Sequence, residues 1–177
     1  MLKKPLLIIL DANVIIDAHR ENYWNALVNG HRIHLPTIVV RDEAQYFDTG
    51  NGKRSINLAP LMSQGLITEI TATPEEDFYL QTLVKPSFLP SFDPGEREAL
   101  ALLKGPRCKN FFFCTGDALA IKGLGILGLS TQGASVEKLL EIIGIKKPLK
   151  KHFTEEWFQK HLITGFQEKT LWIKPKS

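Results

Sequence analysis

The sequence predicts an α/β fold in which a mostly parallel central sheet lies between two layers of helices, a three-layer α/β/α sandwich. Short apolar segments alternate with helical segments along the whole chain, which is typical of βαβ units. Two apolar segments, Leu6–Leu10 and Phe111–Cys114, have no polar face, so we expect them as strands in the middle of the sheet. The length of 177 residues favours one domain over residues 1–145, with a basic helical extension over 146–177 packed on it.

Turn residues separate the elements in the first half of the chain. The helical pattern that starts at Val14 ends at Asn29-Gly30, and Pro36 stops the strand after it. Thr37 is a suitable N-cap for a helix that we expect to run to Phe47, where a glycine-rich loop follows. The elements expected here are helical segments over 14–28, 37–47 and 58–64 and strands over 32–35 and 66–70.

Helix-capping residues mark the elements in the second half. Pro74 and Asp93-Pro94 begin helices with acids in the first turn, and Gly105-Pro106 ends the second of these helices. Ser135 and Thr154 precede two further helices as N-caps. The elements expected here are helices from 74 and over 97–103, 118–122, 135–143 and 154–171, a loop over 85–92 and strands over 111–114 and 126–129.

The composition excludes several classes of protein. No apolar run approaches the roughly 20 residues that cross a bilayer, and Leu6–Leu10 is shorter than the core of a signal peptide. We therefore expect a cytoplasmic protein with no membrane partner. Cys108 and Cys114 lack the spacing of a metal site, and two cysteines are too few for a disulfide framework.

The basic charge is concentrated in the C-terminal extension. The net charge is only +3, but eight lysines lie in the last 32 residues. Such a run is usually a solvated surface, and the alternative is that Lys146, Lys147 and Lys150 contact the phosphates of a nucleic acid. An aromatic and aliphatic stripe shares this segment, and we expect it to pack on its own domain, with an interface to a second copy or a partner as the alternative. The stripe consists of Trp157, Phe158, Leu162, Phe166 and Trp172.

Four acids stand at the ends of predicted elements. Asp11 directly follows one buried strand, and Asp117 follows the other after Thr115-Gly116. Glu43 lies on an early helix, and Glu96 begins a later one. Because parallel α/β sheets bind ligands at the carboxyl ends of their strands, this placement indicates a functional site.

Structural interpretations of these acids remain open at this point. Asp11 is also a good N-cap, and Glu96 falls where a capping-box glutamate sits. Glu98 is an alternative to Glu96, because the register of the helix is not fixed by the sequence. Asp42 is likewise an alternative to Glu43, although Glu43 continues the apolar helical pattern. Asp17 lies beyond the strand end, and we expect it to face solvent.

Four motifs give the chain a resemblance to a known family. They are Leu7-Ile-Ile-Leu-Asp11-Ala-Asn13, Leu35-Pro-Thr-Ile-Val-Val-Arg-Asp-Glu43, Pro94-Gly-Glu96-Arg-Glu98-Ala-Leu-Ala-Leu and Thr115-Gly-Asp117. Their order and spacing over residues 5 to 145 resemble the PIN domain family, metal-dependent nucleases that include the VapC-like ribonuclease toxins of toxin–antitoxin systems.

The resemblance implies a function for each matched residue. Asp11, Glu43, Glu96 and Asp117 would form a catalytic acidic pocket, in which Asp11, Glu96 and Asp117 bind Mg²⁺ or Mn²⁺. Both are hard cations that prefer oxygen ligands. Asn13 and Thr115 would position metal-bound water. RNA would be the substrate, with Lys122 along it, and a small antitoxin would be a partner. The tail lysines Lys146, Lys147 and Lys150 lie outside the matched residues, so their contact with RNA and a second copy as partner are expectations from the tail alone.

The chain departs from the family at two positions. Many members carry a further acid just after the position of Asp117, where this chain has Ala118, and an arginine where it has Lys122. These departures favour one well-bound metal or weak activity. They also keep open an alternative function as a catalytically weak PIN-like module that binds RNA or a protein. A haloacid dehalogenase-like phosphatase is a further alternative, but it needs an acid at position 13, where this chain has Asn13.

Overall fold

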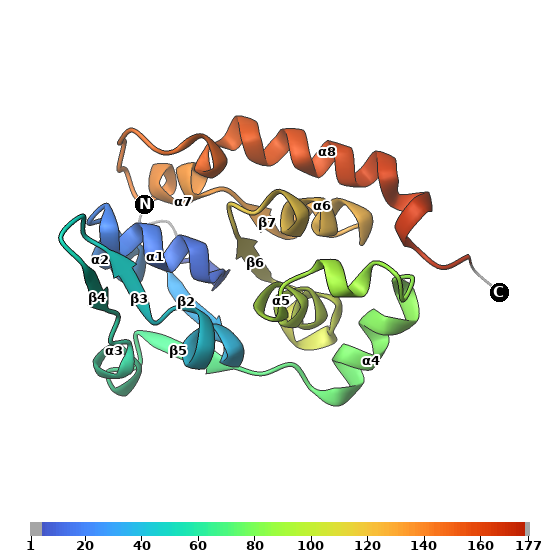
Figure 1. Cartoon of the computed structure of the whole chain (residues 1–177), viewed down its shortest axis with the longest axis horizontal. Helices are drawn as coiled ribbons and strands as arrows, with labels where there is room; N and C mark the ends of the chain where they lie inside the picture. The colour runs from blue at the N-terminus through green and yellow to red at the C-terminus, as the bar shows by residue number, and fades with distance from the viewer. Residues whose placement is uncertain (1–4, 176–177) are drawn as a thin grey trace.

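Five parallel strands form the central sheet of the computed structural model, which describes residues 5–175 (Figure 1). Their order is β5-β2-β1-β6-β7, and every neighbouring pair is parallel. The strands are β1 (Leu7–Leu10), β2 (Arg32–Pro36), β5 (Ile67–Ile70), β6 (Phe111–Cys114) and β7 (Gly133–Ala134). The two apolar segments thus become neighbouring inner strands, as the sequence predicts.

Helices cover both faces of this sheet. Successive residues of a strand point to opposite faces, and Ile8 and Leu10 accordingly belong to a different hydrophobic cluster from Ile9. The cluster of Ile8 includes buried residues of α1 (Ala12–Arg20), α2 (Trp24–Gly30) and α7 (Val136–Ile142). The cluster of Ile9 includes those of α4 (Pro74–Leu83), α5 (Pro94–Lys104), α6 (Ala118–Ile126) and α8 (Glu155–Trp172). The predicted layered α/β architecture is confirmed.

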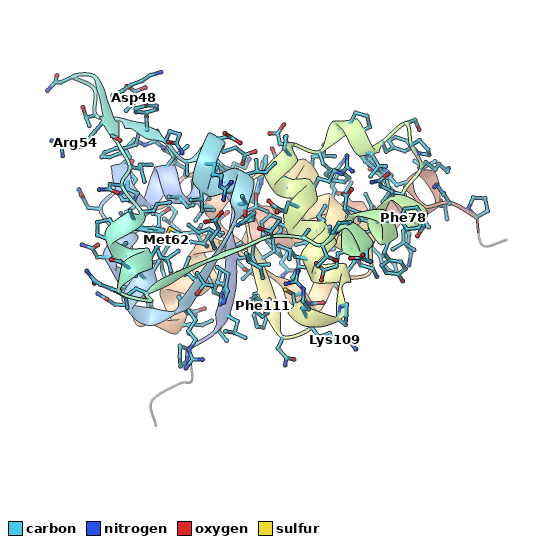
Figure 2. All side chains as sticks on the ribbon, turned by 90° about the horizontal axis from the view of Figure 1, so that it is seen from below. Asp48, Arg54, Met62, Phe78, Lys109 and Phe111 are labelled. Atoms are coloured by element: carbon cyan, nitrogen blue, oxygen red, sulfur yellow. The ribbon has the colours of Figure 1, made fainter. Side chains whose placement is uncertain are left out.

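The predicted helix over 37–47 is wrong beyond Glu43. A π-helical turn, η1 (Val39–Glu43), is followed by an antiparallel hairpin of β3 (Tyr46–Asp48) and β4 (Lys53–Ser55). Gly50 and Gly52 have φ of +81° and +131° and permit the tight turn between them. Figure 2 shows this hairpin, which carries the labelled Asp48 and Arg54, standing away from the rest of the molecule.

The predicted strand over 126–129 is also wrong. Helix α6 continues to Ile126, and the next strand of the sheet is β7. Ile126, Leu127 and Leu129 are apolar because they are buried beside α6 in the cluster of Ile9, and not because they form a strand. Five further short elements of residues 5–175 lie in connecting segments. They are α3 (Ala59–Ser63) and 3-10 turns at Leu89–Ser91, Pro106–Cys108, Ser130–Gln132 and Lys151–Phe153.

The C-terminal extension packs on the domain through α8, which lies along α6 (Figure 1). Gly165 touches the backbone of Lys122 so closely that a Cβ atom would not fit. Phe158, Leu162 and Trp172 are buried, as predicted, whereas Phe166 is 69% exposed and lies outside the packed face. Within residues 5–175, no helix is long and apolar enough to cross a membrane.

Candidate functional site

Two of the predicted acids lie side by side because their strands are neighbours in register. Leu10 of β1 is opposite Cys114 of β6, and the backbone N–H of Asp11 donates to the carbonyl of Cys114 at 3.1 Å. The chain then turns into α1 after Asp11 and into α6 after Asp117. The carboxyl end of the sheet therefore holds Asp11, Thr115 and Asp117 together.

Hydrogen bonds join these residues into one unit. The Thr115 hydroxyl donates to Asp11 Oδ2 at 2.6 Å and accepts the backbone N–H of Asp117 at 3.0 Å. Asn13 Oδ1 accepts the N–H of Gly116 at 3.4 Å. The two polar residues predicted to support the site thus hold the loop over 115–117 against Asp11.

The side chain of Asp117 caps a helix, whereas that of Asp11, for which a capping role was the alternative, does not. Asp117 Oδ1 accepts the N–H groups of Leu119 and Ala120 at 2.6 and 3.1 Å, which caps α6. Asp11 precedes α1 but makes no side-chain capping bond. Its carboxylate is instead aimed at Thr115 and is only 6% exposed.

The other two acids meet at the first turn of α5. Glu96 Oε2 accepts the N–H of Asp93 at 3.1 Å, the capping bond that the sequence predicts, and Glu96 is 5% exposed. Glu43 Oε1 accepts the N–H of Gly95 at 3.0 Å and so ties η1 to α5. Asp42, the alternative to Glu43, is exposed.

Glu98 has a different environment from Glu96. Its two carboxylate oxygens accept the N–H groups of Ile38 at 3.3 Å and Ala72 at 3.2 Å. These bonds link α5 to the segments that follow β2 and β5. The charge of Glu96 thus interacts with Asp117 and Asp11, whereas Glu98 anchors α5 through hydrogen bonds and its charge acts on Glu43.

Electrostatic repulsion links Asp11, Glu96 and Asp117 to one another and Asp11 to Glu43, while Glu43 itself is repelled by Asp93, Asp42 and Glu98. Burial, with a smaller effect of the charges of Glu43 and Asp117, raises the pKa of Asp11 to about 6 despite the hydrogen bond from Thr115. Burial, followed by the charges of Asp117 and Asp11, raises the pKa of Glu96 to about 8. Burial also raises the pKa of Glu43. No Lys, Arg or His within residues 5–175 forms an ion pair with any of the four.

The donor atoms of this cluster suit a hard divalent cation. One oxygen each of Glu43, Glu96 and Asp117 makes no hydrogen bond within the described chain, and none of these oxygens is among the buried atoms that lack a partner. Within residues 5–175, no group of three or more His, Cys, Asp or Glu side chains is arranged so that it could hold a metal ion. Mg²⁺ keeps several waters and binds through one or two carboxylates, so a closed cage is not required.

One prediction about the acids is wrong. Asp17 was expected to face solvent, but it is 1% exposed. Its carboxylate accepts hydrogen bonds from Arg20 at 2.5 Å, Tyr23 at 2.9 Å and Lys150 at 2.7 Å. Arg20 at i+3 was a local signal for this pairing, whereas Lys150 comes from the distant extension.

Three of the four lysines predicted to bind nucleic acid make contacts within the chain. Lys122 pairs with Glu168 at 3.1 Å, and Lys150 pairs with Asp17. Lys147 donates to the carbonyl of Glu21 at 2.6 Å. Lys146 is exposed and makes no such contact within residues 5–175. RNA binding by these lysines stays a prediction.

The sequence analysis missed a contact from the extension to the site loop. The indole N–H of Trp157 donates to the carbonyl of Gly116 at 3.2 Å. Phe153 and His152 lie against the Cα of Gly116, 2.5 and 2.9 Å from where a Cβ would stand. No local pattern signals a contact between residues that are 41 positions apart.

Comparison of the chain with protein-family models, with curated proteins and with solved structures gives no match. Membership of the PIN domain family therefore stays a prediction from the sequence motifs. The geometry contributes a separate observation, since the four acids of those motifs lie together at the carboxyl end of the sheet.

Proposed function

We propose that this chain is a divalent-metal-dependent endoribonuclease that resembles the PIN-domain toxins. The observation that carries the proposal is a cluster of four carboxylates, after β1, in η1, in α5 and after β6, to which no cationic side chain of residues 5–175 is paired. Like charges held together at low solvent exposure are costly, and a divalent cation removes that cost.

Asp11, Glu96 and Asp117 would hold Mg²⁺ or Mn²⁺, and Glu43 would complete the acidic pocket. A bound cation of this kind supplies an activated water and neutralises the charge that develops on a phosphodiester. Thr115 orients the Asp11 carboxylate through its hydroxyl, and Asn13 holds the amide of Gly116. These two residues restrict the motion of the acids, which lowers the cost of forming the loaded site.

RNA is the proposed substrate, and an antitoxin-like protein and a second copy of the chain are proposed partners. The RNA and the antitoxin follow from the resemblance in the sequence motifs, and the second copy follows from the apolar stripe of the extension. The exposed Lys146 and the basic residues Lys53 and Arg54 on the hairpin are among the exposed cations of residues 5–175 that can meet a phosphate backbone.

A second candidate function is a PIN-like module that binds RNA or a protein without cleavage. It is favoured by Ala118, which stands where many family members have a further acid. A haloacid dehalogenase-like phosphatase is less well supported. Asn13 replaces the required acid and is bonded to the Gly116 amide.

Cleavage assays distinguish the two candidates. We expect the purified chain to cut single-stranded or structured RNA with Mg²⁺ or Mn²⁺ and to stop in excess EDTA. Equal cleavage in EDTA would contradict the metal-dependent mechanism, and no cleavage of any RNA or DNA would favour the binding module.

Two variants test whether the cluster of acids is responsible for the cleavage. Asp11→Asn should lower cleavage at least 100-fold while the fold stays intact, because it removes a buried charged ligand. Asp42→Asn is the matched control, since Asp42 is an exposed acid beside Glu43. Unchanged cleavage by Asp11→Asn would place the activity elsewhere, in the protein or in a contaminant, and equal losses in both variants would mean that the loss is not specific to the cluster.

A further inference from the structure

We propose that Trp157, in the C-terminal extension, is a positioning residue for the acid cluster. Its indole holds the loop over 115–117, which carries Thr115 and Asp117, against β1. The consequence for metal binding rests on the proposed function, whereas the mechanical role of Trp157 does not depend on it.

Two hydrogen bonds connect the loop over 115–117 to the residues that follow the first strand. The hydroxyl of Thr115 donates to Asp11, and the amide of Gly116 donates to Asn13 at 3.4 Å. The carbonyl of Gly116 faces the other way, toward the extension, where the Trp157 indole donates to it at 3.2 Å. The bond from Trp157 therefore holds the side of the loop that faces the extension.

The extension also packs on the Cα of Gly116. A Cβ at this position would lie 2.5 Å from Phe153 Cε1 and 2.9 Å from His152 Cδ2. Residue 116 therefore has to be glycine for the extension to come this close. Trp157 is itself held by a ring contact with His161 at 4.2 Å and by the N-cap bond from its backbone N–H to Thr154.

The same extension fixes the helix that Asp117 begins. Helix α8 crosses α6 with Gly165 against the backbone of Lys122, and Glu168 pairs with Lys122. Asp117 thus lies between two anchored segments, the loop held by Trp157 and the helix held by α8. A carboxylate placed in this way loses little freedom when it binds a cation, and removal of such an outer contact typically costs about 10- to 100-fold in metal affinity.

The test compares Trp157→Phe with Trp172→Phe. Phenylalanine keeps most of the ring and removes the N–H. Trp172 lies on the same helix, stacks on Phe88 at 4.2 Å and makes no indole hydrogen bond within the described chain, so it is a matched control. The readouts are amide hydrogen exchange of the metal-free full chain and Mn²⁺ affinity by electron paramagnetic resonance.

In Trp157→Phe we expect the amides of Asp117, Leu119 and Ala120 to exchange about tenfold faster, as loss of one hydrogen bond would give. Mn²⁺ should bind about 10- to 100-fold more weakly. Trp172→Phe should leave both quantities within about twofold, even if it lowers the melting temperature.

Equal exchange in the two variants would overturn the proposal. Faster exchange in Trp157→Phe, with no Mn²⁺ binding by any form, would support the positioning role and overturn the proposed metal-dependent function. If Trp157→Phe does not fold, exchange of the Trp157 indole proton in the unmodified chain decides the question. A protected indole proton supports the bond to Gly116, and free exchange overturns it.

Discussion

Two buried aspartates only six residues apart in the sequence have opposite environments. Asp11 is 6% exposed and Asp17 is 1% exposed, at the start and in the middle of the same helical segment. Asp17 accepts hydrogen bonds from a lysine, an arginine and a tyrosine, which together lower its pKa despite burial. Asp11 has a hydroxyl donor and acidic neighbours, and its pKa is raised.

This difference distinguishes an acid that is buried for stability from an acid that is buried for function. An ion network such as that of Asp17 is complete within the chain and connects α1 to the extension through Lys150. The cluster around Asp11 is incomplete by the same criterion, because no Lys, Arg or His among residues 5–175 pairs with any of its four acids. Charge that is buried without compensation costs stability, so its retention favours a role that needs an external cation.

Substitution of the two aspartates should give the largest contrast. Asp17→Asn should lower the free energy of unfolding by about 3 kcal/mol at pH 7, since it removes the counter-charge of two cations and an acceptor of a buried hydroxyl. Arg20 and Lys150 are partly exposed, which keeps the loss at the low end of the range for buried pairs. Asp11→Asn should be neutral or more stable by about 1 kcal/mol.

Urea denaturation of both variants in EDTA measures this contrast. A loss of stability in Asp11→Asn as large as in Asp17→Asn would identify Asp11 as a structural residue. Loss of cleavage in Asp11→Asn and not in Asp17→Asn would distinguish the two aspartates further.

The sequence predicts the fold where local signals suffice. The inner strands are apolar runs bounded by Pro or acids, and most helices begin at a recognisable cap such as Thr73 or Thr154. The hairpin at 46–55 was missed because Phe47 continues the apolar spacing of the preceding turn. In the structure Phe47 stacks on His19. Strand β7 is only two residues long and has no pattern to detect.

The second largest effect that we expect is in the pH dependence of stability, which should distinguish the acid cluster from the ion network of Asp17. A carboxyl group whose pKa is higher in the folded than in the unfolded chain binds more protons when folded, so stability falls as pH rises between the two values. For Glu96 this window runs from 4.5 to about 8, and for Asp11 from 3.8 to about 6. Asp17 has a lowered pKa, so its contribution is present above 3.8 and is lost as pH falls further.

We therefore expect the wild-type chain to lose about 2 kcal/mol relative to Glu96→Gln between pH 5 and 8 in EDTA. The histidines titrate in the same range, and the difference between the two proteins cancels their contribution. Excess Mn²⁺ at pH 8 should restore the stability of the wild type and not that of the variant. A constant difference across this pH range would contradict the raised pKa of Glu96.

The sequence also predicts part of the site, because parallel strands end at one edge and bring their next residues together. Asp11, Thr115 and Asp117 are examples. Contacts that depend on tertiary packing were not predictable. The bond from Trp157 to Gly116 spans 41 positions, and that from Lys150 to Asp17 spans 133. The choice between Glu96 and Glu98 required the register of α5, which the motif alone does not fix.

The smallest expected effect separates these two glutamates. Glu98 uses both oxygens to accept the backbone N–H groups of Ile38 and Ala72, and glutamine offers only one acceptor there. Glu98→Gln should therefore cost about 1 kcal/mol and leave Mn²⁺ binding unchanged. Glu96→Gln keeps an acceptor for the N–H of Asp93 and removes a buried charge, so it should retain stability at pH 8 and lose Mn²⁺ binding.

In urea denaturation with EDTA, Glu98→Gln should thus be less stable than Glu96→Gln. In a Mn²⁺ titration, Glu98→Gln should bind the cation and Glu96→Gln should not. Reversal of this pattern, with Mn²⁺ binding lost in Glu98→Gln and kept in Glu96→Gln, would exchange their roles. That result would require α5 to turn so that its second acid, and not its capping glutamate, reaches Asp11 when a cation is present. Loss of binding in both variants would instead mean that the anchoring of α5 to Ile38 and Ala72 is as necessary for the site as the carboxylate that faces it.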